Sequence, residues 1–359
     1  MKIVIFGLTI TSSWGNGHGT TYRSLVKALA HRGHHVEFVE KDVEWYRSNR
    51  DMPQPPFCTV HLYDNWSESH AALVQLCGGA DVVVIGSYFP DAIAATEALL
   101  DAGSAPLFFY DIDTPITLAQ LRAHGRTEYL EGAAIPHYKA YLSFTGGPAL
   151  RELEDTFGSP CALPFYCSVD PDLYRPMPLN PEFACDLSYL GTYAADRQPK
   201  LLRYLDSAAA LLPDKRFIVA GPQYPPETKF QPNVERIIHL SPREHPSFYS
   251  SSRFTLNLTR ADMVAAGYSP SVRLFEASAC GAALLSDSWK GLDEFLHPGE
   301  EILLPRDEYE VSDILRNFPE EARQRLGARA RERILSEHTS EHRARQFENV
   351  VTQCYAARG

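Results

Sequence analysis

The stretch that decides the fold runs from Gly267 to Gly281 and reads GYSPSVRLFEASACG. Residues 282–287 follow it and read AALLSD. The first part is rich in small residues, which let a backbone approach a ligand closely. A short helical pattern, a glycine stop and a buried apolar strand come next. The stretch therefore predicts the ligand-binding end of an α/β unit.

The side chains of this stretch indicate what the ligand is. A loop that enters a helix offers free N–H groups and a positive dipole end to an anion. Ser269 and Ser271 add hydroxyl donors, and Arg273 adds a bidentate cation suited to phosphate. A phosphate would repel Glu276, so this carboxylate suits a neutral diol such as a ribose. In the alternative interpretation, Arg273 and Glu276 form an exposed i,i+3 ion pair worth only a few tenths of a kcal/mol.

Residues 276–282, EASACGA, resemble the E-A-x-A-x-G-x-P-V-I segment of GT-B glycosyltransferases. Together with residues 287–293 (DSWKGLD) and 298–302 (PGEEI), they look like the spore-maturation CgeB-like branch. The resemblance implies that Glu276 holds the ribose of a nucleotide-sugar donor and that the preceding loop holds its diphosphate. Retaining members with an E-x7-E motif carry a first glutamate where this chain has Tyr268. The stereochemical outcome therefore stays open.

Length and composition limit the classes of protein. A chain of 359 residues suits two domains of about 150 to 180 residues each. Its 44% hydrophobic and 22% charged residues are typical of a globular protein. A net charge of -11 argues against nucleic acid as a partner, although a local basic cleft can still bind a phosphorylated donor. The seven cysteines form no C-x-x-C pair, so neither a disulfide framework nor a zinc site is expected. Without a long apolar segment, we expect a cytoplasmic protein with no membrane span.

The N-terminal region has the pattern of a βαβ unit. Residues 2–6 and 35–40 are strand-like, and a helical pattern lies between them. Glycines at 15, 17 and 19 invite comparison with a dinucleotide-binding fingerprint, but that motif is G-x-G-x-x-G directly after the strand. Here the spacing is G-x-G-x-G, and it begins eight residues after Gly7. We therefore expect no nicotinamide cofactor, and no other cofactor either.

The segment Gly15-Asn16-Gly17-His18 resembles the first N-domain loop of GT-B enzymes, which passes close to donor and acceptor. Its glycines let the backbone come near a sugar. In inverting relatives a histidine in a similar loop is the general base, a role that suits an imidazole near neutral pH. The resemblance thus implies this role for His18. The alternative is that His18 only forms hydrogen bonds within the loop.

A second candidate set follows the apolar strand at residues 105–110, which ends in Asp111-Ile112-Asp113. Ligands of open α/β sheets bind beyond the carboxyl ends of the strands, so either aspartate is a candidate acceptor ligand or general base. Two carboxylates are a weak metal signal, and the GT-B resemblance implies transfer without a metal. For Asp113 the alternative role is the N-cap of a helix that starts with Thr114 and Pro115.

The C-terminal region supplies the remaining donor residues by resemblance. A strand ends at Gly191, and Arg197 lies where relatives place a basic residue on the donor diphosphate; the alternative is a surface residue at a helix start. The nucleotide base is expected near the backbone at Leu240. His338 and His342 have an i,i+4 spacing that can bind a metal, but a solvated or packed helix face is the favoured interpretation.

The sequence therefore predicts an α/β protein of GT-B architecture, with two Rossmann-like doubly wound domains that face each other across a cleft. Residues 161–176 resemble the crossover between such domains, which gives an acceptor-side domain at 1–165, a nucleotide-sugar domain at 166–335 and a final helix at 336–359 that crosses back. The predicted activity is transfer of a sugar from a nucleoside-diphosphate sugar, with UDP or dTDP expected, to a glycan, small molecule or protein. The alternatives are a sugar-nucleotide epimerase and an inactive nucleotide-sugar-binding protein.

The predicted site residues fall into three groups. The predicted catalytic residues are His18, Asp111 and Asp113; the donor-binding residues are Gly191, Arg197, Leu240, Tyr268, Ser269, Ser271, Arg273 and Glu276; the acceptor-side loop contains Gly15, Asn16 and Gly17.

Overall fold

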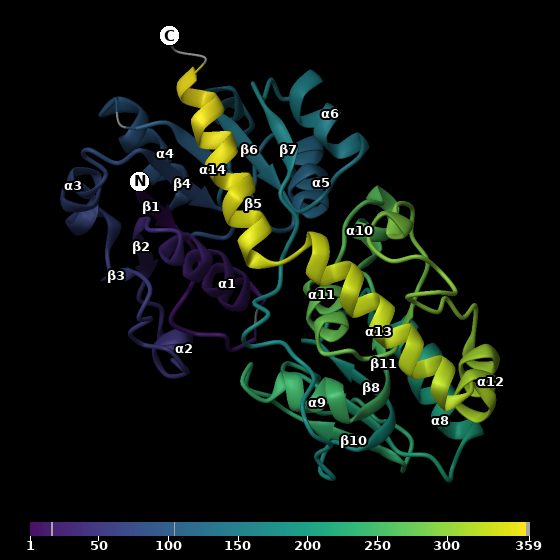
Figure 1. The fold of residues 1–359 in the computed structure, drawn as a ribbon. Helices are drawn as coiled ribbons and strands as arrows, with labels where there is room; N and C mark the ends of the chain where they lie inside the picture. Colours follow the sequence, from purple (N-terminus) through teal and green to yellow (C-terminus); the bar gives the residue numbers. More distant parts are fainter. Residues whose placement is uncertain (16, 104, 357–359) are drawn as a thin grey trace. The chain divides into compact units, whose positions relative to one another are not determined.

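The chain forms two compact α/β units in the computed structural model, which describes residues 1–15, 17–103 and 105–356 (Figure 1). Unit 1 contains Met1–Cys167 and the residues from Ser340 onward, and unit 2 contains Ser168–Thr339. Each unit has one parallel sheet with helices packed on it. The predicted α/β class with two doubly wound sheets is confirmed.

The sheet of unit 1 has seven parallel strands in the order β3-β2-β1-β4-β5-β6-β7. Its central strands are continuous apolar runs, as expected for strands that are covered on both faces. The strand order reverses between β1 and β4, where an open sheet forms its ligand crevice. The strands are β1 (Lys2–Phe6), β2 (His35–Lys41), β3 (Thr59–Tyr63), β4 (Val82–Gly86), β5 (Leu107–Asp111), β6 (Ala140–Ser143) and β7 (Ala162–Pro164).

The helices of unit 1 include one from the far end of the chain. The final helix, α14, lies beside α1 in Figure 1, and Arg32 after α1 pairs with Glu348 of α14 at 2.6 Å. The helices are α1 (His18–His31), α2 (Glu44–Arg47), α3 (Trp66–Leu76), α4 (Ala92–Asp101), α5 (Thr114–His124), the 3-10 turn η1 (Gly132–His137), α6 (Pro148–Asp155) and α14 (Ser340–Ala356).

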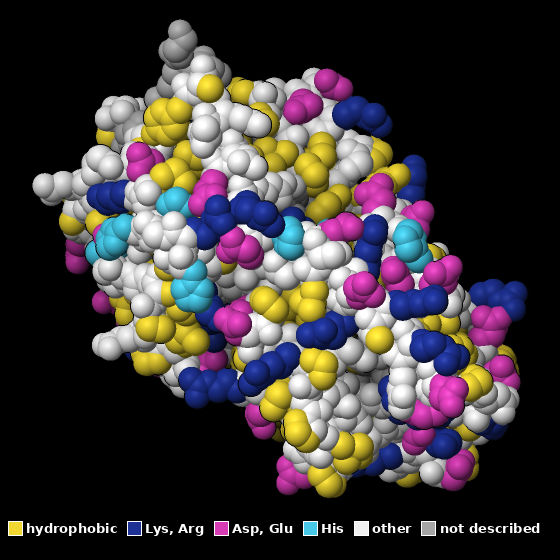
Figure 2. Space-filling model, viewed as in Figure 1, with side chains coloured by type: hydrophobic (Ala, Val, Ile, Leu, Met, Phe, Trp, Pro, Cys, Tyr) yellow, Lys and Arg dark blue, Asp and Glu magenta, His cyan; other side chains and the backbone are white. Residues whose placement is uncertain are grey.

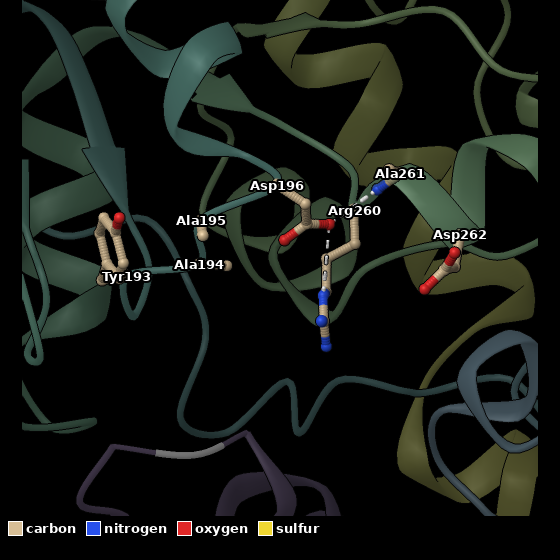
Figure 3. A pocket seen from close by; sticks show the side chains of 7 residues that line it. All are labelled: Tyr193, Ala194, Ala195, Asp196, Arg260, Ala261 and Asp262. Atoms are coloured by element: carbon tan, nitrogen blue, oxygen red, sulfur yellow. Dashed lines mark hydrogen bonds and ion pairs between the residues drawn. The ribbon is translucent and has the colours of Figure 1, made fainter. Parts of the chain in front are cut away.

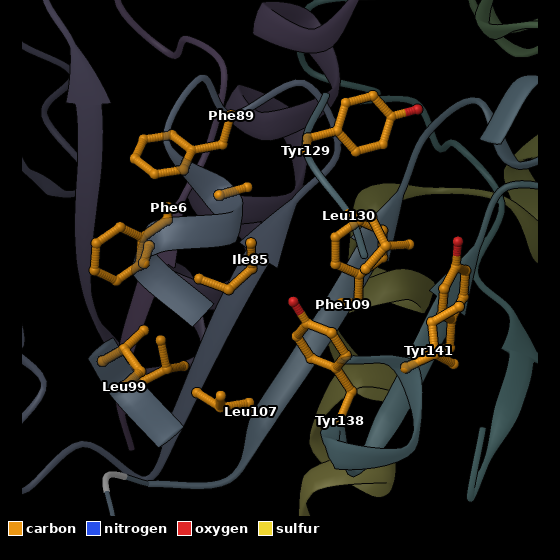
Figure 4. Packing of buried hydrophobic residues seen from close by; sticks show 14 of the residues in the cluster. Phe6, Ile85, Phe89, Leu99, Leu107, Phe109, Tyr129, Leu130, Tyr138 and Tyr141 are labelled. Atoms are coloured by element: carbon orange, nitrogen blue, oxygen red, sulfur yellow. The ribbon is translucent and has the colours of Figure 1, made fainter. Parts of the chain in front are cut away.

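Aromatic and aliphatic side chains pack together in the core of unit 1 (Figure 4). The rings of Phe6 and Phe89 meet edge to face at 5.5 Å, and those of Phe109 and Tyr141 lie 5.2 Å apart. Such aromatic contacts add to the free energy gained by burying the rings. This layer gives a rigid base to the loops that leave β4 and β5.

The sheet of unit 2 has five parallel strands in the order β10-β9-β8-β11-β12. The order reverses between β8 and β11, so the loops that follow these two strands line the ligand crevice. The strands are β8 (Cys185–Leu190), β9 (Phe217–Ala220), β10 (Val234–Ile237), β11 (Ser252–Asn257) and β12 (Leu284–Ser286).

The stretch that opens the sequence analysis forms helix α11 and strand β12, with Gly281 at φ 74° between them. Helix α11 packs on α13. The close approach requires glycine at position 327 of α13, because a Cβ atom there would lie 2.2 Å from the carbonyl oxygen of Gly281, which follows α11. The predicted order of loop, helix, glycine stop and buried strand is confirmed. The helices of unit 2 are α7 (Gln198–Leu201), the π-turn η2 (Leu202–Asp206), α8 (Ser207–Leu211), α9 (His245–Ser251), α10 (Ala261–Ala266), α11 (Val272–Ala279), the 3-10 turn η3 (Leu292–Glu294), α12 (Glu308–Asn317) and α13 (Glu320–Glu337).

On the face shown in Figure 2, acidic and basic side chains are interspersed. In the described ranges, every helix is too short or too polar to cross a membrane.

Candidate functional site

A pocket of about 460 Å³ lies at the crevice of unit 2 (Figure 3). One wall is the loop that follows β8, and the other is the loop that follows β11 together with the start of α10. The lining residues are Tyr193, Ala194, Ala195, Asp196, Arg260, Ala261 and Asp262. Because the strand order reverses between β8 and β11, this is the place where an open α/β sheet binds its ligand.

Arg260 lines this pocket, and Arg197 follows directly after the lining residue Asp196. Arg260 Nε lies 3.6 Å from Asp196 Oδ2, which is too long for a hydrogen bond, and Asp196 accepts one from the Ala261 N–H. Arg197 Nη2 donates to the Thr192 carbonyl at 2.6 Å. The Nε atoms of Arg197 and Arg260 are buried and have no acceptor in the described part of the chain. Buried donors are normally paired, so an anion bound beside Arg260 would supply an acceptor that its guanidinium group lacks.

Arg273, in the first turn of α11, reaches back to the carboxyl ends of β8 and β11. Its Nε donates to the Leu190 carbonyl at 2.5 Å, and its Nη1 donates to Asn257 Oδ1 at 3.2 Å. Its guanidinium also stacks on the Tyr189 ring, 4.6 Å from the centroid. Gly191 leaves room for this side chain, because a Cβ there would lie 2.6 Å from Arg273 Nη2. The structure thus brings the predicted Gly191 and Arg273 together.

The loop before α11 is held by internal contacts. Tyr268 has φ 49°, its N–H donates to the Lys290 carbonyl at 2.6 Å, and its ring packs where Gly291 has no Cβ. Ser271 Oγ donates to Asn257 Oδ1 at 2.6 Å, and Ser269 is buried. The hydroxyl of Ser271 is therefore used within the loop.

Glu276 is 6% exposed and Arg273 is 7% exposed, so the alternative of an exposed ion pair between them is wrong. Burial raises the pKa of Glu276 to about 7, while a hydrogen bond from the Tyr174 hydroxyl and the charge of Arg273 oppose this rise. His245 Nδ1 lies 3.2 Å from the Tyr174 hydroxyl and 3.9 Å from Glu276. His245 Nε2 lies 3.2 Å from the Leu240 carbonyl oxygen. Tyr174 and His245 thus connect the two predicted donor residues Leu240 and Glu276.

The predicted acceptor-side loop of unit 1 is anchored by Glu40 of β2, which is fully buried. Its carboxylate accepts hydrogen bonds from the N–H groups of Ile10 and Thr11 at 2.7 and 3.0 Å, and from the Thr9 and Thr11 hydroxyls. In a dinucleotide-binding fold, an acidic residue at the end of the second strand, the position of Glu40, binds a ribose. Here it shapes the loop that leads to α1.

His18 is the first residue of α1 and is 8% exposed. Its Nδ1 atom has no hydrogen-bond partner in the described part of the chain. Burial lowers its pKa, although the negative charge of Asp113 opposes this shift, so the imidazole is neutral near pH 7. Gly15 has φ 69° and Gly17 is the N-cap residue of α1, while Asn16 lies outside the described residues.

Asp111 ends β5 with its side chain fully buried. Its Oδ2 accepts from the Tyr141 hydroxyl at 2.5 Å, and its Oδ1 accepts from the Thr117 hydroxyl at 3.0 Å and the Asp113 N–H at 3.2 Å. Burial raises the pKa of Asp111 to about 6. Because both oxygens are engaged internally, this geometry suits a residue that positions the loop before α5.

Asp113 occupies the N-cap position of α5, as the alternative interpretation expects, but its side chain makes no capping hydrogen bond. The Tyr88 hydroxyl instead hydrogen-bonds to it. The Tyr88 ring lies edge-on to His18, with centroids 5.3 Å apart, and 4.7 Å from the Tyr129 ring. The structure thus brings His18 and Asp113 together around Tyr88.

Residues 197–349 match a family profile described as glycosyl transferase-like. Sucrose-phosphate synthase from Thermosynechococcus elongatus is 15% identical, with a TM-score of 0.71 over 99% of this chain and 100% of that chain. These findings support a glycosyltransferase of GT-B fold.

Two further solved structures have the same fold. HepE from Anabaena, solved with UDP and glucose, gives a TM-score of 0.74 at 13% identity over 98% of this chain and 100% of that chain. The catalytic domain of Starch Synthase IV from Arabidopsis thaliana, bound to ADP and acarbose, gives 0.68 at 13% identity over 99% of each chain. No curated protein sequence matches the chain significantly.

Four residues of the candidate sites are not among the residues predicted from sequence: Tyr88, Tyr174, His245 and Arg260. Tyr174 lies in the segment that resembles the domain crossover, and His245 follows the strand and turn that end near Leu240. The sequence therefore indicates where these two residues lie in the chain. It does not predict that they contact each other, because they are 71 residues apart.

Within the described ranges, no three His, Cys, Asp or Glu side chains come close enough to hold a metal ion. His338 is buried, and its ring lies 5.1 Å from that of Phe275 and 5.5 Å from that of Phe295. His338 therefore has the packing role that the sequence analysis favoured.

Proposed function

We propose that unit 2 binds a nucleoside-diphosphate sugar and that the protein transfers the sugar to a hydroxyl group of an acceptor bound by unit 1. The observation that carries this proposal is the pocket at the reversal point of the unit 2 sheet, which Arg260 lines and Arg197 adjoins; within the described residues, the buried Nε donor of each arginine has no acceptor. A diphosphate supplies acceptors of the required charge. HepE, which shares the fold, is solved with UDP, and UDP or dTDP is our proposed donor nucleotide.

The donor would lie along the carboxyl ends of β8 and β11. Arg273 and the N-terminus of α11 face the same end of the sheet as Arg197 and Arg260, and they would add positive charge and N–H donors to the diphosphate. Glu276, with Tyr174 beside it, would accept hydrogen bonds from the ribose hydroxyls. The backbone at Leu240 would lie against the base.

The chemical step breaks the bond between the sugar C1 and the diphosphate oxygen, and the electron pair leaves with the diphosphate. The acceptor oxygen forms the new bond to C1, and its proton passes to the neutral imidazole of His18. The arginines stabilise the charge that develops on the leaving group, which is the largest electrostatic requirement of such a step. We propose that this charge comes from the protein and that the transfer needs no metal ion.

Two finer assignments complete the proposal. The segments at 287–293 and 298–302 support placing the chain in the CgeB-like branch. Asp111 would order the loop before α5, and Asp113 would contact the acceptor.

The test is a thermal-shift titration of the full chain with UDP, dTDP, ADP, GDP and their sugars. A stabilising nucleotide at 100 times its Kd raises the free energy of unfolding by about 2.7 kcal/mol. Arg260→Ala and Arg273→Ala should each weaken this nucleotide at least tenfold, while Arg325→Ala on the exposed face of α13 should leave its affinity unchanged. If no nucleotide stabilises the folded wild type at millimolar concentration, the proposal is wrong.

A second assay separates transfer from the two alternatives. Labelled donor is incubated with and without candidate acceptors, and the products are separated. Transfer gives a labelled acceptor, an epimerase changes the sugar without any acceptor, and a binding protein leaves the donor intact.

A further inference from the structure

The ends of β4 and β5 in unit 1 hold a cluster that the proposed transfer leaves without a defined ligand. Its centre is Tyr88, the second residue after β4, which has φ 62°. A bulky residue in the left-handed region is strained and persists only where its surroundings require it. Strain of this kind is concentrated at ligand sites, so the conformation of Tyr88 calls for a functional reason.

His18 gives a second, independent indication of a ligand, because one of its ring nitrogens is buried without a partner among the described residues. His18 is 8% exposed, and its Nδ1 has no hydrogen-bond partner in the described part of the chain. The ring of His18 meets that of Tyr88 edge-on, with centroids 5.3 Å apart. An acceptor hydroxyl at this point would supply the missing hydrogen bond.

The charge of the cluster limits what that ligand can be. Asp113 is partly exposed and its side chain does not cap α5, while its backbone N–H donates to Asp111 Oδ1 at 3.2 Å. Arg23, the first arginine of α1, is engaged by Asp51 through two hydrogen bonds of 2.7 and 2.9 Å and by the Ile10 carbonyl. A phosphate or carboxylate group would meet the Asp113 carboxylate, with the buried Asp111 side chain hydrogen-bonded to its N–H, and would be repelled.

We propose that the acceptor is a neutral, polyhydroxylated molecule such as an unphosphorylated saccharide, and that Tyr88 and Asp113 determine this specificity. This inference rests on the proposed function. One acceptor hydroxyl donates to the Asp113 carboxylate beside the Tyr88 hydroxyl. The Tyr88 ring is partly exposed and packs against the buried Tyr129 ring, with centroids 4.7 Å apart, so it offers an apolar contact to the C–H side of a sugar ring. The reacting hydroxyl donates to His18 Nδ1.

The test is equilibrium binding to the full chain by ligand-observed NMR, with the nucleotide that stabilises unit 2 present. The probes are neutral mono- and disaccharides, each paired with its 6-phosphate ester. At least one neutral sugar should bind, with an affinity at least tenfold above that of its ester. Tyr88→Phe should weaken the neutral sugar about tenfold, and Asp113→Asn should reduce the preference over the ester at least threefold.

Asp101→Asn, at the exposed end of α4, is the matched control and should change neither affinity. A melting curve for each variant excludes simple unfolding. The proposal is overturned if an ester binds as tightly as its neutral sugar, if neither class binds, or if both variants keep the wild-type preference. Nucleotide affinity is measured in the same samples. A lack of nucleotide binding would refute the proposed function, independently of the result for the acceptor.

Discussion

Replacing Glu276 by Gln should stabilise the protein at high pH, which is unusual for a change in a binding site. Burial raises the pKa of Glu276 to about 7, from 4.5 for an ordinary glutamate. The folded chain therefore holds this proton more tightly than the unfolded chain does. Between pH 4.5 and 7 the folded state binds more protons, so the free energy of unfolding falls as the pH rises.

The size of the effect follows from the shift. A shift of about 2.5 pKa units at about 1.36 kcal/mol per unit corresponds to about 3 kcal/mol above pH 7. Glutamine keeps the shape of the side chain and never ionises. For a unit of this size, about 3 kcal/mol corresponds to a rise in melting temperature of roughly 6 to 12 °C at pH 8. At pH 5 the wild-type carboxyl is protonated, so Glu276→Gln should change the melting temperature little.

The assay is thermal unfolding of both proteins without ligand at pH 5, 6, 7 and 8, followed by circular dichroism. The difference in melting temperature, variant minus wild type, should increase with pH. Glu276→Gln should bind the nucleotide more weakly than the wild type, because a neutral amide is a weaker partner for ribose hydroxyls than a carboxylate. A variant that is less stable than the wild type by the same amount at every pH would show that the buried carboxylate is not raised in pKa.

Three further predictions follow from the same contacts. His18→Ala should lower the transfer rate by about 10² to 10⁴-fold and leave the nucleotide Kd unchanged, as measured by steady-state kinetics and calorimetry; an equal loss of nucleotide affinity would argue against a base role. Gly191→Ala should weaken nucleotide binding at least tenfold, because its Cβ would lie 2.6 Å from Arg273 Nη2, and unchanged calorimetric titrations would show that this contact does not matter. Removing divalent ions with EDTA should leave the transfer rate within about twofold, and activity that returns only with added Mg²⁺ or Mn²⁺ would contradict transfer without a metal.

Much of the fold could be predicted from sequence because its signals are local. The run from Val82 to Ile85 has only apolar β-branched residues and reads as a central strand at first sight. Likewise, the spacing of Arg273, Glu276 and Gly281 identifies a short helix with a polar ligand end. These patterns depend on chain geometry within one turn or one strand, so no knowledge of the tertiary structure is needed.

The candidate site was only partly predictable because its contacts join distant segments. Asp111 looked like a free carboxylate at a strand end, but the Tyr141 hydroxyl, 30 residues away, occupies its Oδ2 atom. The strained backbone of Tyr88 leaves no mark in the sequence, since strain is set by the surrounding fold. Likewise, the buried Nε atoms of Arg197 and Arg260 lack acceptors among the described residues, and this becomes visible only when their surroundings have positions.

A crystal structure with bound UDP would test the central claim most directly. The account predicts the diphosphate in the pocket at the reversal point of the unit 2 sheet, with hydrogen bonds from Arg197 Nε and Arg260 Nε, and the ribose hydroxyls on Glu276. UDP bound elsewhere on the chain, or bound here with both Nε atoms still unpaired and Glu276 facing away from the ribose, would contradict it.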